Sequence, residues 1–177
     1  MFQTRHDDTY LDQLDLLIKC SALNDFYSTN IYSIYRVVDH YRKYDLARRM
    51  DEGDLSLVED LRKIKMEGKD KPWDFYSFAT KFCAHHNPEI FPIYDYYVDK
   101  MLREFRNRDK KLKFRNSDLK DYVTFRDILC EFRKVYGIED LTFRKVDIML
   151  WLGGKACFPR NYKKKTKTDG ADGVTGQ

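Results

Sequence analysis

The sequence has none of the glycine-rich motifs that mark the commonest enzyme classes. It contains no Gly-x-x-x-x-Gly-Lys loop, no Gly-x-Gly-x-x-Gly turn and no Gly-x-Ser-x-Gly elbow. Such glycines let backbone N–H groups approach a phosphate, or hold a serine nucleophile at a sharp turn. Nucleotide hydrolysis by a P-loop, dinucleotide binding by a Rossmann unit and serine hydrolysis are therefore disfavoured.

Long apolar runs and paired cysteines are also missing. No stretch approaches the roughly eighteen apolar residues of a membrane span, and the first residues lack the apolar core of a secretion signal. The four cysteines are widely spaced with no Cys-x-x-Cys pair, which is typical of reduced thiols. His85 and His86 follow Cys83, but adjacent helical side chains point about 100° apart and make a poor zinc site. We expect a cytoplasmic protein with no membrane contact, no metal and no cofactor.

Charged and aromatic residues are abundant instead. Of the 177 residues, 35% are charged and 15% aromatic, with thirteen tyrosines and twelve phenylalanines. A chain of this size and composition can build one core in which rings contribute as much as aliphatic side chains. We expect a single domain over residues 1–162. Residues 163–177 are poor in apolar side chains and rich in glycine and lysine, so we expect a flexible tail there.

Helical periodicity runs through the chain, and no segment alternates apolar with polar residues as a half-buried strand does. The expected fold class is all-α, with about seven helices in a single orthogonal bundle. Apolar spacing, caps and breakers predict helices at Asp8 to Ala22, Ser28 or Asn30 to Val38, Leu55 to Ile64, Asp74 to His86, Asp95 to Phe105, Ser117 to Tyr136, and Thr142 to Trp151, the last ended by Gly153 and Gly154.

Positive charge is concentrated in two blocks. From Lys100 to Arg115 there are eight basic and two acidic residues, and Arg160 to Lys167 adds five basic residues with no acid. A basic surface on an otherwise acidic body suits contact with a phosphate backbone, although a solvated helix end and a disordered tail would give the same pattern. The candidate nucleic-acid-binding residues are Arg103, Arg106, Arg108, Lys110, Lys111, Lys113 and Arg115.

Lys81 and Asp95 are the candidate catalytic residues, because they are ionisable groups within an aromatic and otherwise apolar stretch. A lysine that loses water on folding becomes a usable amine nucleophile, but a helical wheel places Lys81 to one side of the buried face, where it would be an exposed flank residue. Asp95 follows Pro92, Ile93 and Tyr94 and is well placed to cap the next helix. A capping carboxylate stays ionised, so the same residue could stabilise a developing cation.

Four aromatic residues flank this pair and are candidates for stacking on nucleobases: Trp73, Tyr94, Tyr96 and Tyr97. Base stacking is worth about 1–3 kcal/mol per base where it occurs. Aromatic residues at these spacings also serve as core residues, and the sequence leaves both interpretations open.

Four strings carry a resemblance to known proteins: Ser77-Phe78-Ala79-Thr80-Lys81, His86-Asn87-Pro88-Glu89, Phe91-Pro92-Ile93-Tyr94-Asp95-Tyr96-Tyr97-Val98, and Trp151-Leu152-Gly153-Gly154-Lys155. Together they resemble a group of small bacterial proteins of undefined role. These in turn are similar to the helix-hairpin-helix DNA glycosylase superfamily, particularly its oxidised-guanine branch. The resemblance implies that Lys81 takes the place of the lysine nucleophile and that Pro92-Ile93-Tyr94-Asp95 takes the place of the turn with the essential carboxylate.

Two functions follow as hypotheses. In the first, the protein is a DNA glycosylase-like enzyme of DNA repair that binds DNA, with Lys81 attacking C1′ of a flipped nucleotide and Asp95 stabilising the cationic sugar. In the second, it is a non-catalytic helical module that binds nucleic acid or a protein partner through Lys100 to Arg115. A third interpretation is that the aromatic segment is only core and Asp95 only a cap.

Overall fold

The computed structural model describes residues 8–66, 68 and 70–159. The chain is mostly helical, as the sequence predicts, with one short two-stranded antiparallel sheet. Its elements, in order, are α1 Asp8–Phe26, α2 Ile34–Tyr41, α3 Leu46–Asp51, α4 Ser56–Arg62, β1 Lys63–Ile64, β2 Trp73–Asp74, α5 Tyr76–His86, α6 Tyr96–Asp109, the 3-10 helix η1 Asp118–Lys120, α7 Tyr122–Val135 and α8 Phe143–Cys157.

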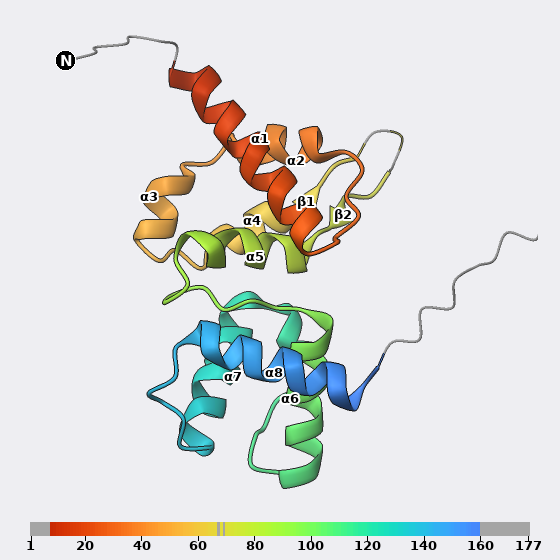
Figure 1. Cartoon of the computed structure of the whole chain (residues 1–177), viewed down its shortest axis with the longest axis vertical. Helices are drawn as coiled ribbons and strands as arrows, with labels where there is room; N and C mark the ends of the chain where they lie inside the picture. The colour runs from red at the N-terminus through yellow and green to blue at the C-terminus, as the bar shows by residue number, and fades with distance from the viewer. Residues whose placement is uncertain (1–7, 67, 69, 160–177) are drawn as a thin grey trace, which may run out of the picture.

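The helices are arranged in two halves, with α1–α5 in the upper half of Figure 1 and α6–α8 in the lower half. One continuous set of buried side chains runs through both halves, so the halves share a core. Helix α5 lies at the junction, and its residues 78–84 are all buried. A helix that is covered on every side cannot show the one-faced pattern of a surface helix, which is why a helical wheel misplaces its polar residues.

Several caps lie where the sequence predicts them. The Asp95 carboxylate accepts the backbone N–H of Val98 at 2.8 Å and begins α6. Thr142 caps α8 in the same way, and Gly137, at a φ of 64°, follows the end of α7. Each side-chain oxygen satisfies a backbone donor that the first helical turn leaves unpaired.

Other helix boundaries differ from the prediction. Helix α7 begins after Asp121, whose carboxylate accepts the N–H of Thr124 at 2.9 Å, and Ser117 instead precedes the 3-10 turn. Helix α2 begins only at Ile34, because Ser28 and Asn30 adopt positive φ angles that break the helical path. Helix α3 was missed, since its six residues are too few for a periodic signal.

Helix α8 runs through Gly153 and Gly154, so the prediction that these glycines end it was wrong. The reason is a close helix crossing: a Cβ at Gly154 would lie 2.6 Å from Cβ of Tyr97 on α6. Glycine allows the two backbones to approach here, and small residues at helix contacts have this effect. The crossing fixes α8 against the first turn of α6, beside Asp95.

Across the part of the chain that the structure describes, no helix is both long enough and apolar enough to cross a membrane.

Candidate functional site

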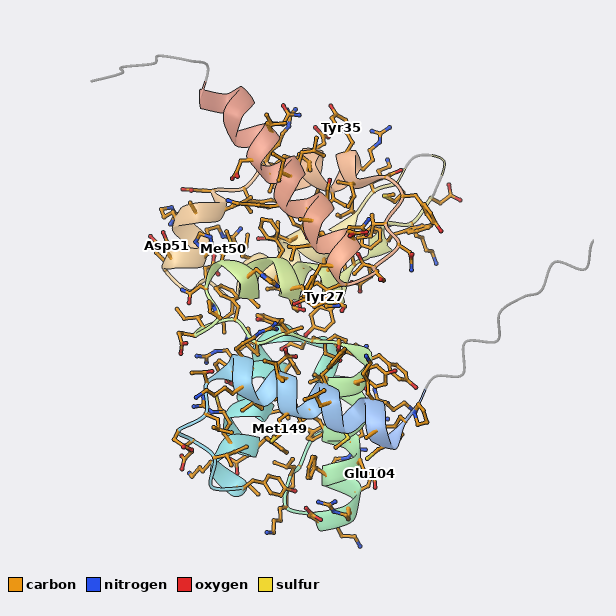
Figure 2. The ribbon with its side chains drawn as sticks, in the orientation of Figure 1. Tyr27, Tyr35, Met50, Asp51, Glu104 and Met149 are labelled. Carbon is orange, nitrogen blue, oxygen red and sulfur yellow. The ribbon has the colours of Figure 1, made fainter. Side chains whose placement is uncertain are left out.

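Lys81 lies on α5, the helix at the junction, and is buried, with only 6% of the residue exposed. Its Nζ donates a hydrogen bond to the Ser77 hydroxyl at 2.8 Å and lies 4.6 Å from the centre of the Tyr27 ring. Tyr27 follows the end of α1 and points into the junction (Figure 2). The sequence left open whether Lys81 is buried or is an exposed residue on the flank of its helix. The structure shows that it is buried.

Asp95 is held near Lys81 through a short connection between α5 and the loop before α6. The side chain of Thr80, which is fully buried, accepts the backbone N–H of Tyr94 at 3.1 Å. Thr80 precedes Lys81 and Tyr94 precedes Asp95, so this one hydroxyl couples the two candidate residues. The loop is also held by α7, where the Tyr122 hydroxyl donates to the carbonyl of Pro92 at 2.9 Å.

Helix α8 adds two charged residues that the sequence did not single out. Arg144 Nη1 lies 3.0 Å from Oδ2 of Asp147, and the Asp147 side chain is only 11% exposed. Both residues affect the pKa of Tyr27, which places them on the face of α8 that looks toward the upper half. On the Tyr27 side, His85 Nε2 lies 2.8 Å from the Tyr27 hydroxyl.

The electrostatics of the junction push an amine and an acid toward their neutral forms. Burial lowers the pKa of Lys81, an effect that Asp95 and Asp147 oppose. Burial, reinforced by the charge of Asp95, raises the pKa of Asp147 to about 7, against the opposing charges of Arg144 and Lys81. Desolvation disfavours charge on either type of group, and both effects are of the kind that tunes catalytic residues.

Lys81 is nevertheless not ion-paired. Among the residues that the structure describes, no carboxylate oxygen lies within 4.0 Å of its Nζ. Asp95 and Asp147 are close enough to influence the pKa of Lys81 but leave it without a salt bridge. The amine is thus desolvated and hydrogen-bonded to Ser77, and within the described residues no carboxylate lies at ion-pair distance from it.

The four candidate stacking residues have different environments. Tyr94 is 6% exposed, and its ring packs 4.5 Å from that of Tyr76, as expected of a core residue and not of a stacking platform. Trp73 on β2 and Tyr96 on α6 are 47% and 41% exposed. Tyr97 is partly buried, and its backbone lies against Gly154.

The basic block from Lys100 to Arg115 lies at the other end of α6 from Asp95. In Figure 2, Glu104 marks this region of α6 in the lower half, well away from Tyr27 at the junction. Several of its arginines have structural partners, since Arg106 donates to the carbonyl of Phe114 at 2.9 Å. Arg103 pairs with Asp99, Arg108 with Asp109 and Arg115 with Asp118. The exposed basic side chains of the block are those of Arg108, Lys110, Lys111, Lys113 and Arg115. The basic residues from Arg160 onward lie outside the described residues.

The adjacent histidines, His85 and His86, contact different parts of the fold. His85 faces Tyr27, whereas His86 Nε2 lies 2.9 Å from Asp51 of α3. In the described ranges, no three His, Cys, Asp or Glu side chains gather as a metal site would require.

Comparison with known proteins identifies a family for the chain. A family model described as HI_0787_N, an N-terminal domain, matches residues 1–90. The chain is also 40% identical over 156 residues to an uncharacterized protein of Haemophilus influenzae, covering 88% of this chain and 73% of that protein. The chain belongs to this family. No solved structure matches it significantly.

The family model ends at residue 90, between Lys81 and Asp95. Residues 1–90 include α1–α5 and therefore Tyr27 and Lys81, whereas Asp95, Arg144 and Asp147 lie beyond it. The charged cluster thus requires both halves of the molecule. Sequence reasoning missed Arg144 and Asp147 because nothing near Thr142 in the chain indicates that this helix faces Lys81.

Proposed function

We propose that this protein is a DNA glycosylase-like enzyme that uses Lys81 as an amine nucleophile on a damaged or modified nucleotide. The observation that carries the proposal is the buried Lys81 amine, whose pKa is lowered and which has no ion-pair partner among the described residues. Supporting it, the chain has a lysine, then a proline-containing turn, then an aspartate that begins the next helix, in the order that the resemblance implies. Lys81 lies within helix α5 here, whereas the lysine of the glycosylase superfamily lies in a hairpin.

The chemistry requires a flipped nucleotide whose sugar enters between Lys81 and the two carboxyl groups. The Lys81 lone pair attacks C1′, and the bond from C1′ to the base breaks with its electron pair leaving on the base. The attached nitrogen then loses a proton and forms a double bond to C1′ as the C1′–O4′ bond breaks, O4′ takes up a proton, and a protonated imine joins Lys81 to C1′. Asp95, which accepts the N–H of Val98, supplies a fixed negative charge near the cationic sugar.

Trapping with borohydride tests this proposal, because borohydride reduces the imine to a stable secondary amine. We expect wild-type protein to form a covalent adduct with a duplex that contains a single abasic site, and Lys81→Ala to form none. Peptide mapping of the adduct should identify Lys81 as the attached residue.

A second lysine with a lowered pKa provides the matched control. Lys120 is half-exposed, and burial lowers its pKa, while its Nζ lies 4.3 Å from the centre of the Tyr94 ring. Lys120→Ala should trap as well as wild type. If Lys81→Ala still forms the adduct and Lys120→Ala does not, the nucleophile is misassigned.

The exposed lysines beyond α6 favour a second candidate, a helical module that binds nucleic acid or a protein partner. Lys110, Lys111 and Lys113 are exposed, and within the described residues none has a carboxylate within 4.0 Å. Binding through them should weaken steeply with salt, and Lys111→Ala with Lys113→Ala should reduce the salt slope by about two. Binding to duplex DNA that is independent of salt would contradict this role.

A further inference from the structure

Helix α1 carries apolar side chains on two opposite sides. Its buried side includes Leu16 and Leu23, which are 7% and 9% exposed. On the opposite side lie Leu14 and Ile18, which are 42% and 59% exposed, and the exposed Ala22. Residues four apart follow one line along a helix, so these three form an outer stripe of α1. A surface helix normally presents polar residues on its outer side, and nothing in the described part of the chain covers this stripe.

Helix α8 has the same organisation. Val146 and Leu150 are buried against the lower half, at 0% and 1% exposed. On the opposite side, Ile148, Met149 and Leu152 are 43%, 39% and 55% exposed, and together they form an outer stripe of α8. Single exposed apolar residues are ordinary, but a row of them along a helix indicates an interaction surface.

The two stripes lie on the same face of the molecule, one in each half. Helix α1 is nearest the viewer in the upper half of Figure 1, and α8 is nearest the viewer in the lower half. Since the buried side of each helix faces the core behind it, both outer stripes point toward the viewer. A second copy turned by 180° about an axis across this face would place its α8 on the first copy's α1, and its α1 on the first copy's α8.

The unpaired charges beside the two stripes are of opposite sign. Asp15 and Asp25 lie on the outer side of α1, where Asp15 also pairs with Lys19 at 2.6 Å. Lys145 and Lys155 lie on the outer side of α8. Among the described residues, no opposite charge lies within 4.0 Å of Asp25 or of these two lysines. Two copies of α8 face to face would bring like charges together, so the charges favour the pairing of α1 with α8.

We propose that the protein is a symmetric dimer in which the outer stripe of α1 in each copy packs on the outer stripe of α8 in the other. The contact is closed, because each copy uses both stripes and leaves neither for a third copy. Apolar burial provides the affinity, and the opposite charges select the pairing. This inference goes beyond the proposed function and does not depend on it.

The mass of the protein in solution tests the dimer. We expect the wild-type chain to show twice the mass of one chain in analytical ultracentrifugation and to dissociate on dilution. Ile18→Ser and Leu152→Ser should each raise the dimer Kd by about tenfold or more, because each removes an apolar side chain from both contacts. Val123→Ser is the matched control, since Val123 is 45% exposed on α7, outside both stripes, and it should leave the Kd unchanged.

Reversing the charges of one helix at a time tests the pairing. One variant combines Asp15→Lys with Asp25→Lys and makes the outer side of α1 basic. The other combines Lys145→Glu with Lys155→Glu and makes the outer side of α8 acidic. Each variant alone should be monomeric where wild type dimerises, because like charges then face each other. An equimolar mixture should dimerise, because each helix of one variant then meets the opposite charge on the other.

The contrary results each overturn the inference. Wild type with the mass of one chain at all concentrations would show that a second copy does not cover the stripes. Faster hydrogen exchange in α8 of such a monomer after removal of residues 160–177 would assign that segment as the cover. A dimer that Ile18→Ser and Leu152→Ser leave intact, or a mixture of the reversed variants that stays monomeric, would place the contact elsewhere. Circular dichroism checks that the variants, all at exposed positions, remain folded.

Discussion

The hydroxyl of Thr80 accepts the backbone N–H of Tyr94 at 3.1 Å, across the boundary between the two halves of the molecule. Its own hydrogen is within reach of the carbonyls of Ser77 at 3.0 Å and of Tyr94 at 3.3 Å. Because the neighbours of Thr80 and Tyr94 are Lys81 and Asp95, this buried hydroxyl helps to hold the two candidate residues near each other.

Replacing Thr80 with valine tests this connection, since valine has nearly the same shape and no hydroxyl. The buried N–H of Tyr94 would lose its partner, and we expect the free energy of unfolding to fall by about 1–3 kcal/mol. Urea denaturation measures the loss. Thr124→Val is the control, because the Thr124 hydroxyl bonds only the exposed Asp121, and it should cost less than about 1 kcal/mol. Equal losses in the two variants would contradict the importance of the Thr80 contact.

The buried amine of Lys81 should reduce stability in exchange for reactivity. Since its folded-state pKa is lowered, the folded protein disfavours the charged form, a penalty that is full below the folded pKa and disappears as the pH rises past the unfolded value near 10.4. Lys81→Met should therefore unfold at higher urea than wild type at pH 7, with a smaller gain at pH 10. The exposed Lys111→Met should show little change at either pH. A Lys81→Met protein that is less stable at pH 7 would show that the Ser77 and Tyr27 contacts outweigh desolvation.

Asp147 should give the stability of the protein a distinct pH dependence. The folded-state pKa is raised to about 7, so the folded protein binds a proton that the unfolded chain releases near pH 4. Wild type therefore loses stability between about pH 4 and pH 7, and the loss is complete above 7. Asp147→Asn removes this loss, so the stability difference between variant and wild type should grow over that range and then level off. Asp127→Asn, at an exposed position of α7, should show no such trend. A flat difference for Asp147→Asn would mean that Asp147 is charged throughout.

The crossing of α6 and α8 distinguishes two adjacent glycines. A Cβ at Gly154 would lie 2.6 Å from Cβ and 3.1 Å from Cα of Tyr97, so Gly154→Ala must push the helices apart and should cost about 1–3 kcal/mol. A Cβ at Gly153 would meet only the flexible end of Met101 at 3.3 Å. Because alanine favours a helix over glycine by about 0.5–1 kcal/mol, Gly153→Ala should be neutral or stabilising. Thermal unfolding of both variants checks the contrast, which would disappear if the helices were loosely packed.

Much of the fold could be predicted from local signals. The periodic apolar residues of α7, the capping side chains of Asp95 and Thr142, and the glycine after α7 act within a few residues of their own position. Such features are set by backbone geometry and by the need to pair the free N–H and C=O groups at helix ends, so they can be predicted from the sequence. The short helix α3 and the two-residue strands β1 and β2 depend on their surroundings and were not predicted.

The sequence by itself determined the helical fold class, the cap that begins α6 and the presence of a lysine and an aspartate in an aromatic stretch. Only the tertiary structure decided that Lys81 is buried and that Arg144 and Asp147, more than sixty positions further on, face the same junction. The physical reason is range: caps and periodicity act over one or two helical turns, whereas desolvation and charge coupling depend on which helices cover a side chain after the chain has folded.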